Sequence, residues 1–442
     1  MKFTSSLIKG TFLLTTSAVI CRIIGFFYKI YISNNIGTKN FGIFQLVMPL
    51  FGITSILCCH CVETSITKLV AGNYNERKNY CLCGLSISSL LAVICFIILY
   101  NNSNFIATKL LFEARCDILI KYMSITLLLS VIHSTINGYY FGIMNIILPS
   151  ICNIAEQIIK LSISFLLIAM CYDNGDVPDY RIVGKSMLYS EGFSGLVGIT
   201  IIILTNKLSI NRSNLPKLTH YKNFLAFLFP ITANKLILCS LSSIESILLP
   251  ANLKVYGLSP DNAISIYGIL SGMAMSVIMF PQTFTISLSS LLLPKISNLS
   301  NDNNHLQNNI KDKSANKIVK TTNYSIKLCL GIGILFAIIF ISCGKTIGLI
   351  LFKSETCGTF IQMLGFICPF MYTNTACSSI LNGLSKTGTV FICNIFAIII
   401  RLISVGFFVP IYGINAYMYG LLISSLVTFC LNLTFIKSYN QC

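Results

Sequence analysis

Two basic residues within an apolar segment are the first side chains that could do chemistry. Arg22 and Lys29 interrupt a hydrophobic run near the start of the chain. In a helix, a spacing of seven residues is about two turns, so both side chains share one face, with Gly25 and Phe26 between them. Such a basic stripe suits an anionic ligand, for example a phosphate or pyrophosphate. The alternative is that Lys29 extends to a membrane interface while Arg22 pairs with an acid of the second or seventh apolar segment.

Other ionisable residues also lie inside apolar segments. A charge in the middle of a membrane span costs roughly 2.5–3.5 kcal/mol, so it should face the protein interior or a wet cavity. Glu156 and Lys160 have i,i+4 spacing, and a mutually neutralising pair is the slightly favoured interpretation of these two residues. The anion-binding candidates besides Arg22 and Lys29 are Lys160 and Arg401, and the candidates for a coupling ion or an ion pair are Glu63, Glu156 and Glu245.

No motif of a soluble enzyme or of a metal protein is present in the sequence. The cluster Cys58-Cys59-His60-Cys61 lacks the second ligand pair of a zinc site, and most of the 19 cysteines lie in apolar runs, where a thiol packs as a small hydrophobe. The four histidines are scattered, and there is no Walker A motif or glycine-rich dinucleotide turn. The sequence therefore predicts a transporter rather than an enzyme, with no catalytic residue, no metal and no cofactor. The membrane potential, H⁺ and Na⁺ remain open as sources of energy.

Hydrophobic segments long enough to cross a bilayer recur about a dozen times along the chain. The composition, 55% hydrophobic and 10% charged, agrees with that count. We therefore expect an all-α polytopic membrane protein. The predicted spans cover about residues 8–33, 41–69, 81–100, 118–141, 146–172, 183–206, 222–250, 264–292, 322–343, 359–381, 389–409 and 413–436.

The loop charges predict the orientation. The formal charge is +17, but the basic residues are dispersed among the loops, which favours anionic lipid over nucleic acid as the partner. A cytoplasmic N-terminus places most loop lysines and arginines inside and the acidic segment 172–181 outside, so both termini are predicted to be cytoplasmic. Residues 297–323, rich in Asn and Lys, are predicted to be a cytoplasmic loop containing a short surface helix.

An internal repeat divides the chain into two similar halves. At an offset of 241 residues, Gly142 matches Gly383, Ile151–Ile154 matches Ile392–Ile395, and Lys160 matches Arg401. Six predicted spans separate the copies, so both have the same orientation in the membrane. The sequence thus predicts a six-helix lobe at 1–206, a cytoplasmic linker at 207–222 and a second lobe at 223–442, in a parallel repeat with a cavity between the halves.

Several motifs, in order along nearly the whole chain, resemble one transporter group. The motifs are Cys21–Ile30, Gly42–Leu46, Ile66–Ala71, Gly138–Gly142, Tyr267–Ala274, Leu293–Ser297, Leu381–Leu384 and Tyr412–Asn415. Together they resemble the stage V sporulation protein B group of the multidrug/oligosaccharidyl-lipid/polysaccharide (MOP) exporter superfamily. The resemblance implies two six-helix lobes around a central cavity that opens alternately to each side. It also implies that basic residues of the first helix, Arg22 and less firmly Lys29, line that cavity.

The function implied by the resemblance is export of a lipid-linked saccharide. The substrate would be an anionic polyprenyl-pyrophosphate-linked glycan, a peptidoglycan precursor or a polysaccharide intermediate, moved across the cytoplasmic membrane of a bacterium. Cell-wall and spore-cortex synthesis are the processes in which such a flippase would act, with cell-wall synthesis proteins as partners. Two alternatives stay open: a cation-coupled multidrug antiporter of the same superfamily, and a scaffold for envelope or spore assembly that transports nothing.

Overall fold

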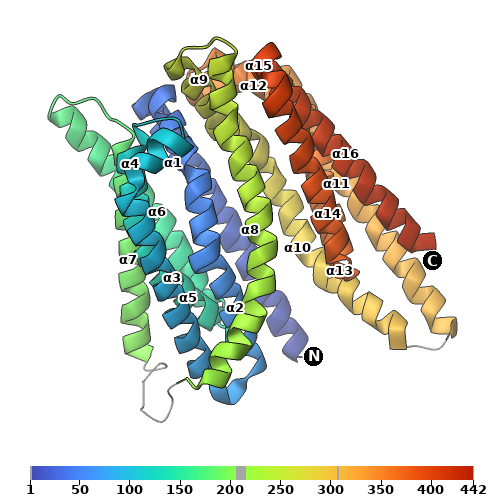
Figure 1. Ribbon diagram of the computed structural model, residues 1–442. Coiled ribbons are helices and arrows are strands. Elements are labelled where there is room, and N and C mark those ends of the chain that lie inside the picture. The colour runs from blue at the N-terminus through green and yellow to red at the C-terminus, as the bar shows by residue number, and fades with distance from the viewer. Residues whose placement is uncertain (1, 206–215, 306–307, 442) are drawn as a thin grey trace. The chain divides into compact units, whose positions relative to one another are not determined.

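The computed structural model describes residues 2–205, 216–305 and 308–441, and this part of the chain is built from helices joined by short connections, without strands (Figure 1). The first half contains α1 (Lys2–Ser55), α2 (Cys61–Gly72), α3 (Arg77–Asn101), α4 (Ser103–Phe105), α5 (Cys116–Gly142), α6 (Ile147–Asp173) and α7 (Arg181–Thr205). The second half contains α8 (Leu218–Val255), α9 (Pro260–Tyr267), α10 (Met275–His305), α11 (Asn308–Phe352), α12 (Glu355–Gly365), α13 (Cys368–Gly383), α14 (Thr387–Ile403), α15 (Val409–Tyr412) and α16 (Ile414–Gln441).

The helices correspond to the predicted spans. Nine helical stretches among the described residues are long and apolar enough to cross a membrane. One of them, Leu13–Gly72, contains most of the first predicted span and all of the second, which are separated where Gly37 takes a positive φ of 79°. The sixth predicted span is α7, and the tenth is formed by α12 and α13 in succession. The all-α polytopic fold is therefore confirmed.

The prediction of a loop with a short helix at 297–323 was wrong. Helix α10 continues to His305, and α11 already begins at Asn308. The physical reason is that extending an existing helix adds one hydrogen bond for each residue fixed, whereas starting a new helix is costly. Two long membrane helices can therefore continue into polar sequence.

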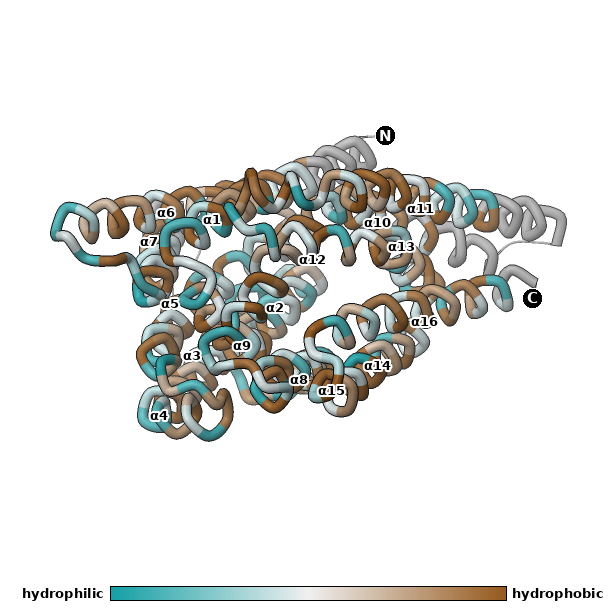
Figure 2. The backbone as a smooth tube through the Cα atoms, turned by 90° about the horizontal axis from the view of Figure 1, so that it is seen from above, coloured by the Kyte–Doolittle hydropathy of each residue, from teal (hydrophilic) through white to brown (hydrophobic). Residues whose placement is uncertain are grey.

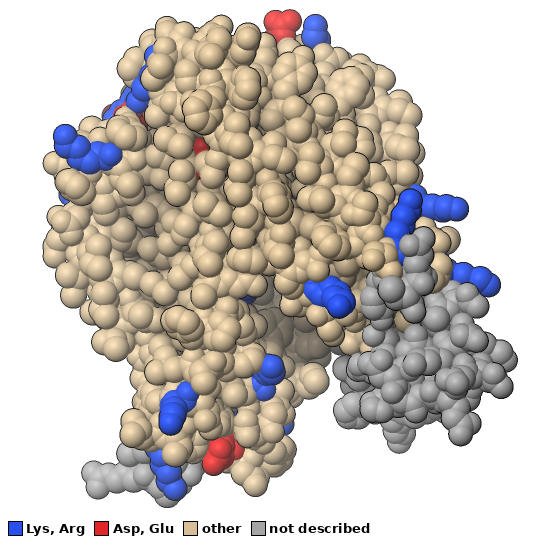
Figure 3. Space-filling view, turned by 45° about the vertical axis from the view of Figure 1, so that its right-hand side comes forward, with Lys and Arg blue, Asp and Glu red and all other residues tan. Residues whose placement is uncertain are grey.

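The surface is that of a membrane protein. Figure 2 shows hydrophobic residues predominating along α6, α8 and α14. On the face drawn in Figure 3, Lys, Arg, Asp and Glu are few, and a wide area carries no charged side chain. Exposed apolar side chains such as Phe165, Phe229 and Phe396 are what lipid-facing helices require.

The chain forms two compact units, Met1–Ile247 and Leu248–Cys442. The boundary falls inside α8, because its N-terminal part packs into the core of the first unit. In that core Phe224 and Leu228 lie against buried residues of α2, α3 and α5, among them Ile66, Cys81 and Tyr140. The predicted linker 207–222 lies largely outside the described residues, and the division at 206 and 223 stays a prediction.

Both copies of the repeat form the same local structure. Helices α5 and α13 end at Gly142 and Gly383, and the following turns match in each detail: Met144 and Ser385 both have a φ of 61°. The closing hydrogen bonds also correspond, from the Asn145 amide to the Tyr140 carbonyl and from the Lys386 amide to the Leu381 carbonyl. The sequence repeat is therefore also a structural repeat at these turns.

Small residues bring α5 close to α2, as the Gly138-x-x-x-Gly142 spacing predicts. A Cβ atom at Gly138 would lie 2.9 Å from the backbone oxygen of Glu63, and one at Gly142 would lie 2.7 Å from the Cβ of Val70. The Thr67 hydroxyl donates to the Gly138 carbonyl at 3.2 Å. This close contact fixes α5, which carries the central residue of the candidate site.

Candidate functional site

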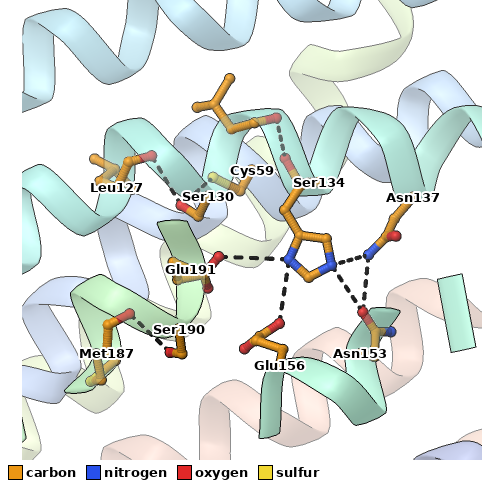
Figure 4. A network of polar contacts seen from close by, with 12 residues as sticks. Cys59, Leu127, Ser130, Ser134, Asn137, Asn153, Glu156, Met187, Ser190 and Glu191 are labelled. Carbon is orange, nitrogen blue, oxygen red and sulfur yellow. Dashed lines mark hydrogen bonds and ion pairs between the residues drawn. The ribbon is translucent and has the colours of Figure 1, made fainter. Parts of the chain in front are cut away.

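A histidine of α5 lies between two carboxylates in the first unit (Figure 4). The Nδ1 atom of His133 is 3.3 Å from Oε2 of Glu156 on α6 and 3.6 Å from Oε2 of Glu191 on α7. All three side chains are largely buried, with exposed fractions of 11%, 15% and 18%. The three helices thus place two acids and one imidazole in a region shielded from solvent. Such a group can hold a proton or a metal ion.

Two asparagines hold the other side of the imidazole ring. The Nε2 atom of His133 is 2.9 Å from Nδ2 of Asn137 and 3.1 Å from Oδ1 of Asn153. Asn137 also donates to Asn153 at 3.1 Å, which links α5 to α6. Asn137 is one turn after His133, and Asn153 is one turn before Glu156, so each helix contributes two polar residues from one face.

A cavity of about 320 Å³ lies beside this network and contains the predicted anion-binding residue. Arg22 of α1 lines it together with Asn153, Glu156 and Gln157 of α6. Gln157 donates to Glu156 at 3.3 Å. Among the described residues, none forms an ion pair with Arg22. The structure therefore places Arg22 and Glu156, two residues selected from the sequence, at one cavity.

The next basic residues along α1 and α6 surround a tyrosine. The ammonium group of Lys160 lies 4.8 Å from the centre of the Tyr28 ring, a cation–π contact. The Tyr28 hydroxyl forms a hydrogen bond of 3.1 Å with Ser186 of α7. Lys29 is partly buried and within electrostatic range of Lys160. Lys29 and Lys160 thus belong to one basic region, in which Lys160 already has an aromatic partner.

Two predicted acids have other surroundings. Glu63 of α2 is partly buried and within electrostatic range of His133 and of Lys235 on α8. Glu245 of α8 is buried and does not belong to the group around His133. The cysteines pack as predicted: Cys58 and Cys59 lie in one hydrophobic cluster, and Cys61 lies in another.

Arg401 lies in the second unit, where it lines a cavity of about 370 Å³. The polar residues of that lining are Gln282, Asn374, Thr375, Ser378, Asn394, Ser424, Ser425 and Thr428. Asn374 donates to the Ser425 carbonyl at 3.1 Å, and Asn432 donates to Asn374 at 3.3 Å. This cavity therefore combines a single basic side chain with uncharged hydrogen-bonding groups.

His133 and Asn137 were not predicted from the sequence, and Glu191 was not among the predicted site residues. A lone histidine in an apolar run is usually a satisfied core residue, and the two acids that face His133 lie 23 and 58 positions further along the chain. One signal for this site was present in the sequence. His133 and Asn137 have i,i+4 spacing and so form a polar face on the fourth predicted span. Asn153 and Glu156, with i,i+3 spacing, form a second polar face on the fifth span, and two such faces on successive helices can pack together.

Comparisons with known proteins agree with this architecture. The model of the family described as Polysaccharide biosynthesis protein matches residues 7–300, and the MatE model matches residues 308–407. Stage V sporulation protein B of Bacillus subtilis (strain 168) is 22% identical over 394 residues, covering 86% of this chain and 73% of that protein. Among solved structures, the lipid II flippase MurJ in an inward closed conformation has a TM-score of 0.73 at 16% identity, covering 96% of this chain and 87% of that one. An inward-facing multidrug resistance MATE transporter of the MOP superfamily has a TM-score of 0.69 at 14% identity, covering 95% of each chain.

The described residues form a multi-pass helical bundle of membrane-protein character, with the fold of MATE and MurJ. The family model covers well over half of the sequence. The chain therefore belongs to the polysaccharide biosynthesis protein family.

Proposed function

We propose that this protein is a flippase that moves a polyprenyl-pyrophosphate-linked saccharide across the cytoplasmic membrane by alternating access. The observation that carries the proposal is the position of Arg22, a residue of a membrane helix that lines a cavity. A guanidinium keeps its charge at any physiological pH and can grip two phosphate oxygens at once. Lys29 lies two turns along the same helix and would extend the basic path. The family membership supports a saccharide intermediate as the substrate.

The test is transport by purified protein in liposomes. The probe is a fluorescent undecaprenyl-pyrophosphate-linked saccharide, and the fraction that a membrane-impermeant quencher can reach reports its movement between leaflets. We expect Arg22→Ala to abolish flipping while the thermal unfolding temperature stays close to wild type. Arg22→Lys should restore flipping only in part, because an ammonium lacks the planar fork of a guanidinium.

A matched control removes an arginine elsewhere. Arg181 forms a surface ion pair with Asp179 at 3.4 Å at the start of α7, so Arg181→Ala should transport normally. Normal flipping by Arg22→Ala would contradict the proposal. If the Arg22→Ala protein unfolds more easily but transports normally per folded molecule, Arg22 has a structural role only.

The acidic network supports a second candidate, a cation-coupled antiporter for organic cations. The carboxylates of Glu156 and Glu191 are the groups that such a cargo requires, and Glu156 lines the same cavity as Arg22. The same liposomes decide between the candidates. Uptake of an organic cation driven by a proton or sodium gradient, without movement of the lipid-linked saccharide, would favour the antiporter. Transport of neither substrate would favour the assembly scaffold.

A further inference from the structure

Glu156 belongs to two arrangements at once: its carboxylate lies 3.3 Å from Nδ1 of His133, and it lines the cavity that contains Arg22. We propose that His133 is a proton-binding site whose occupancy, transmitted through Glu156, controls how tightly the Arg22 cavity binds an anionic ligand. This inference rests on the proposed role of Arg22 and adds the ion and the residue through which binding is regulated.

The hydrogen bonds of the imidazole suit both of its protonation states. When Nε2 carries no proton, it can accept from Nδ2 of Asn137 at 2.9 Å. When Nε2 is protonated, it can donate to Oδ1 of Asn153 at 3.1 Å. We assign the proton of the neutral ring to Nδ1, because the two carboxylates that face Nδ1 can only accept a hydrogen bond when ionised. His133 can therefore gain or lose the proton on Nε2 without moving, which a purely structural histidine does not need.

The two carboxylates provide the charge that makes protonation favourable. Both face the same ring nitrogen, and Oε2 of Glu191 is buried without a hydrogen-bond partner. One N–H group cannot serve two carboxylates well, and the distances of 3.3 and 3.6 Å are longer than the roughly 2.7–2.9 Å of a strong charge-assisted hydrogen bond. A second proton turns the ring into a cation, which compensates both acids through the low-dielectric interior.

The repeat shows that this charge arrangement is specific to the first unit. At the offset of 241 residues, His133 corresponds to Asn374, Asn153 to Asn394 and Glu156 to Ala397. All three counterparts line the cavity of the second unit that contains Arg401. The same scaffold therefore carries a titratable group in one unit and uncharged residues in the other, as expected if proton binding is a dedicated task of the first unit.

The other ionisable groups near His133 come from α1, α2 and the turn before it, α6, α7 and α8. Their charges also act on a proton bound to His133. Glu63 is a further acid within electrostatic range of His133, and Lys235 lies within electrostatic range of Glu63. Among the described residues, the groups that line the Arg22 cavity or lie within electrostatic range of the acids around His133 include Arg22 and Cys21 of α1, Cys59, His60 and Glu63 near the start of α2, Cys152, Glu156 and Lys160 of α6, Glu191 of α7, and Lys235 of α8.

The sign of the coupling follows from this geometry. When His133 is neutral, the carboxylate of Glu156 makes the cavity less favourable for an anion and attracts the Arg22 guanidinium. When His133 is protonated, its positive charge offsets that of Glu156, and Arg22 binds the anion more tightly. By linkage, an anion that binds at Arg22 must then draw a proton onto His133.

The test measures binding and proton uptake in nanodiscs. The probe is an undecaprenyl-pyrophosphate-linked saccharide, because its two esterified phosphates keep the same charge across the pH range used. We expect its affinity for wild type to fall as pH rises from 5.5 to 8, by at most about tenfold per pH unit for one linked proton. Binding in weakly buffered solution should consume protons, which a pH dye reports.

The first variant replaces His133 by its counterpart in the repeat. His133→Asn, the residue that the second unit has at this position, should abolish both the pH dependence and the proton uptake, and His133→Gln replaces it if the first variant does not fold. Glu156→Gln should bind at pH 8 as tightly as wild type does at pH 5.5. The matched control is His220→Asn, which removes a histidine that contacts Glu76 at 3.4 Å outside this network and should keep the wild-type pH dependence.

The outcomes separate this inference from the proposed function. If Arg22→Ala abolishes binding but wild type shows neither pH dependence nor proton uptake, the proton site is refuted and the proposed function stands. If Arg22→Ala binds as wild type does, both are refuted. Metal analysis that finds one bound zinc per chain, absent from His133→Asn, would overturn the proton site in favour of a metal site.

Discussion

At the scale of single residues, Tyr28 connects three helices of the first unit. Its ring lies beneath the Lys160 ammonium, and its hydroxyl forms a hydrogen bond with Ser186, which in turn donates to the Val183 carbonyl at 2.9 Å. Tyr28 and Ser186 are both buried. The tyrosine thus holds Lys160 in place while it ties α1 to α7.

We expect Tyr28→Phe to lower the free energy of unfolding by about 1 kcal/mol, because the buried Ser186 oxygen loses its donor while the ring remains under Lys160. Thermal unfolding of the purified protein measures the change. Tyr31→Phe is the control, since the Tyr31 ring stacks on Phe165 at 5.7 Å and keeps that contact without the hydroxyl. Equal unfolding temperatures for Tyr28→Phe and wild type would show that the Ser186 bond contributes nothing.

The sequence allowed part of the site to be predicted. Arg22 and Glu156 could be selected because a charge inside an apolar span is costly, so its presence indicates a function or a partner. The sequence could not show that Arg22 and Glu156 share a cavity, because that depends on how α1 packs against α6. His133 carries no obligatory charge, so nothing in the apolar run around it indicated a partner.

At the scale of helices, the close contact between α5 and α2 holds in place the helix that carries His133. We expect Gly138→Ala to destabilise the protein by roughly 1–3 kcal/mol, because the new methyl group would meet the Glu63 backbone oxygen at 2.9 Å, and backbone cannot move aside as a flexible side chain can. Thermal unfolding again provides the measurement.

Gly25→Ala is the matched control in α1. The nearest atom to a Cβ there is Oε1 of Gln157 at 3.9 Å, an ordinary contact. Because alanine favours a helix over glycine by up to about 1 kcal/mol, this variant should be as stable as wild type or more stable. A Gly138→Ala protein that unfolds like Gly25→Ala would refute the close contact.

The helices themselves were predictable because each bilayer crossing leaves a long apolar segment in the sequence. The helix ends outside the membrane could not be predicted. Helices α10 and α11, for example, both continue into the Asn- and Lys-rich segment. The division of the tenth span into α12 and α13 was also not predicted, although Pro369 near the start of α13 is compatible with it.

At the scale of the whole molecule, the orientation in the membrane stays a prediction from the loop charges. In a Cys171→Ser background, we expect Asp176→Cys to react in intact cells with a membrane-impermeant maleimide, because the acidic segment 172–181 should face outward. Glu76→Cys, in the exposed connection between α2 and α3, should react only after the membrane is permeabilised. The reverse labelling pattern would invert the topology.

The N-terminal part of α8 completes the core of the first unit, and this has a consequence for biosynthesis. Membrane helices emerge from the ribosome in chain order, yet the core that contains Ile66, Cys81 and Tyr140 is completed by Phe224 and Leu228. The first six predicted spans, once synthesised, therefore leave one side of this core uncovered until the next helix follows. During that interval the nascent chain must expose the apolar surface to lipid or to an insertion factor, and a chain truncated before Leu218 would remain in that incomplete state.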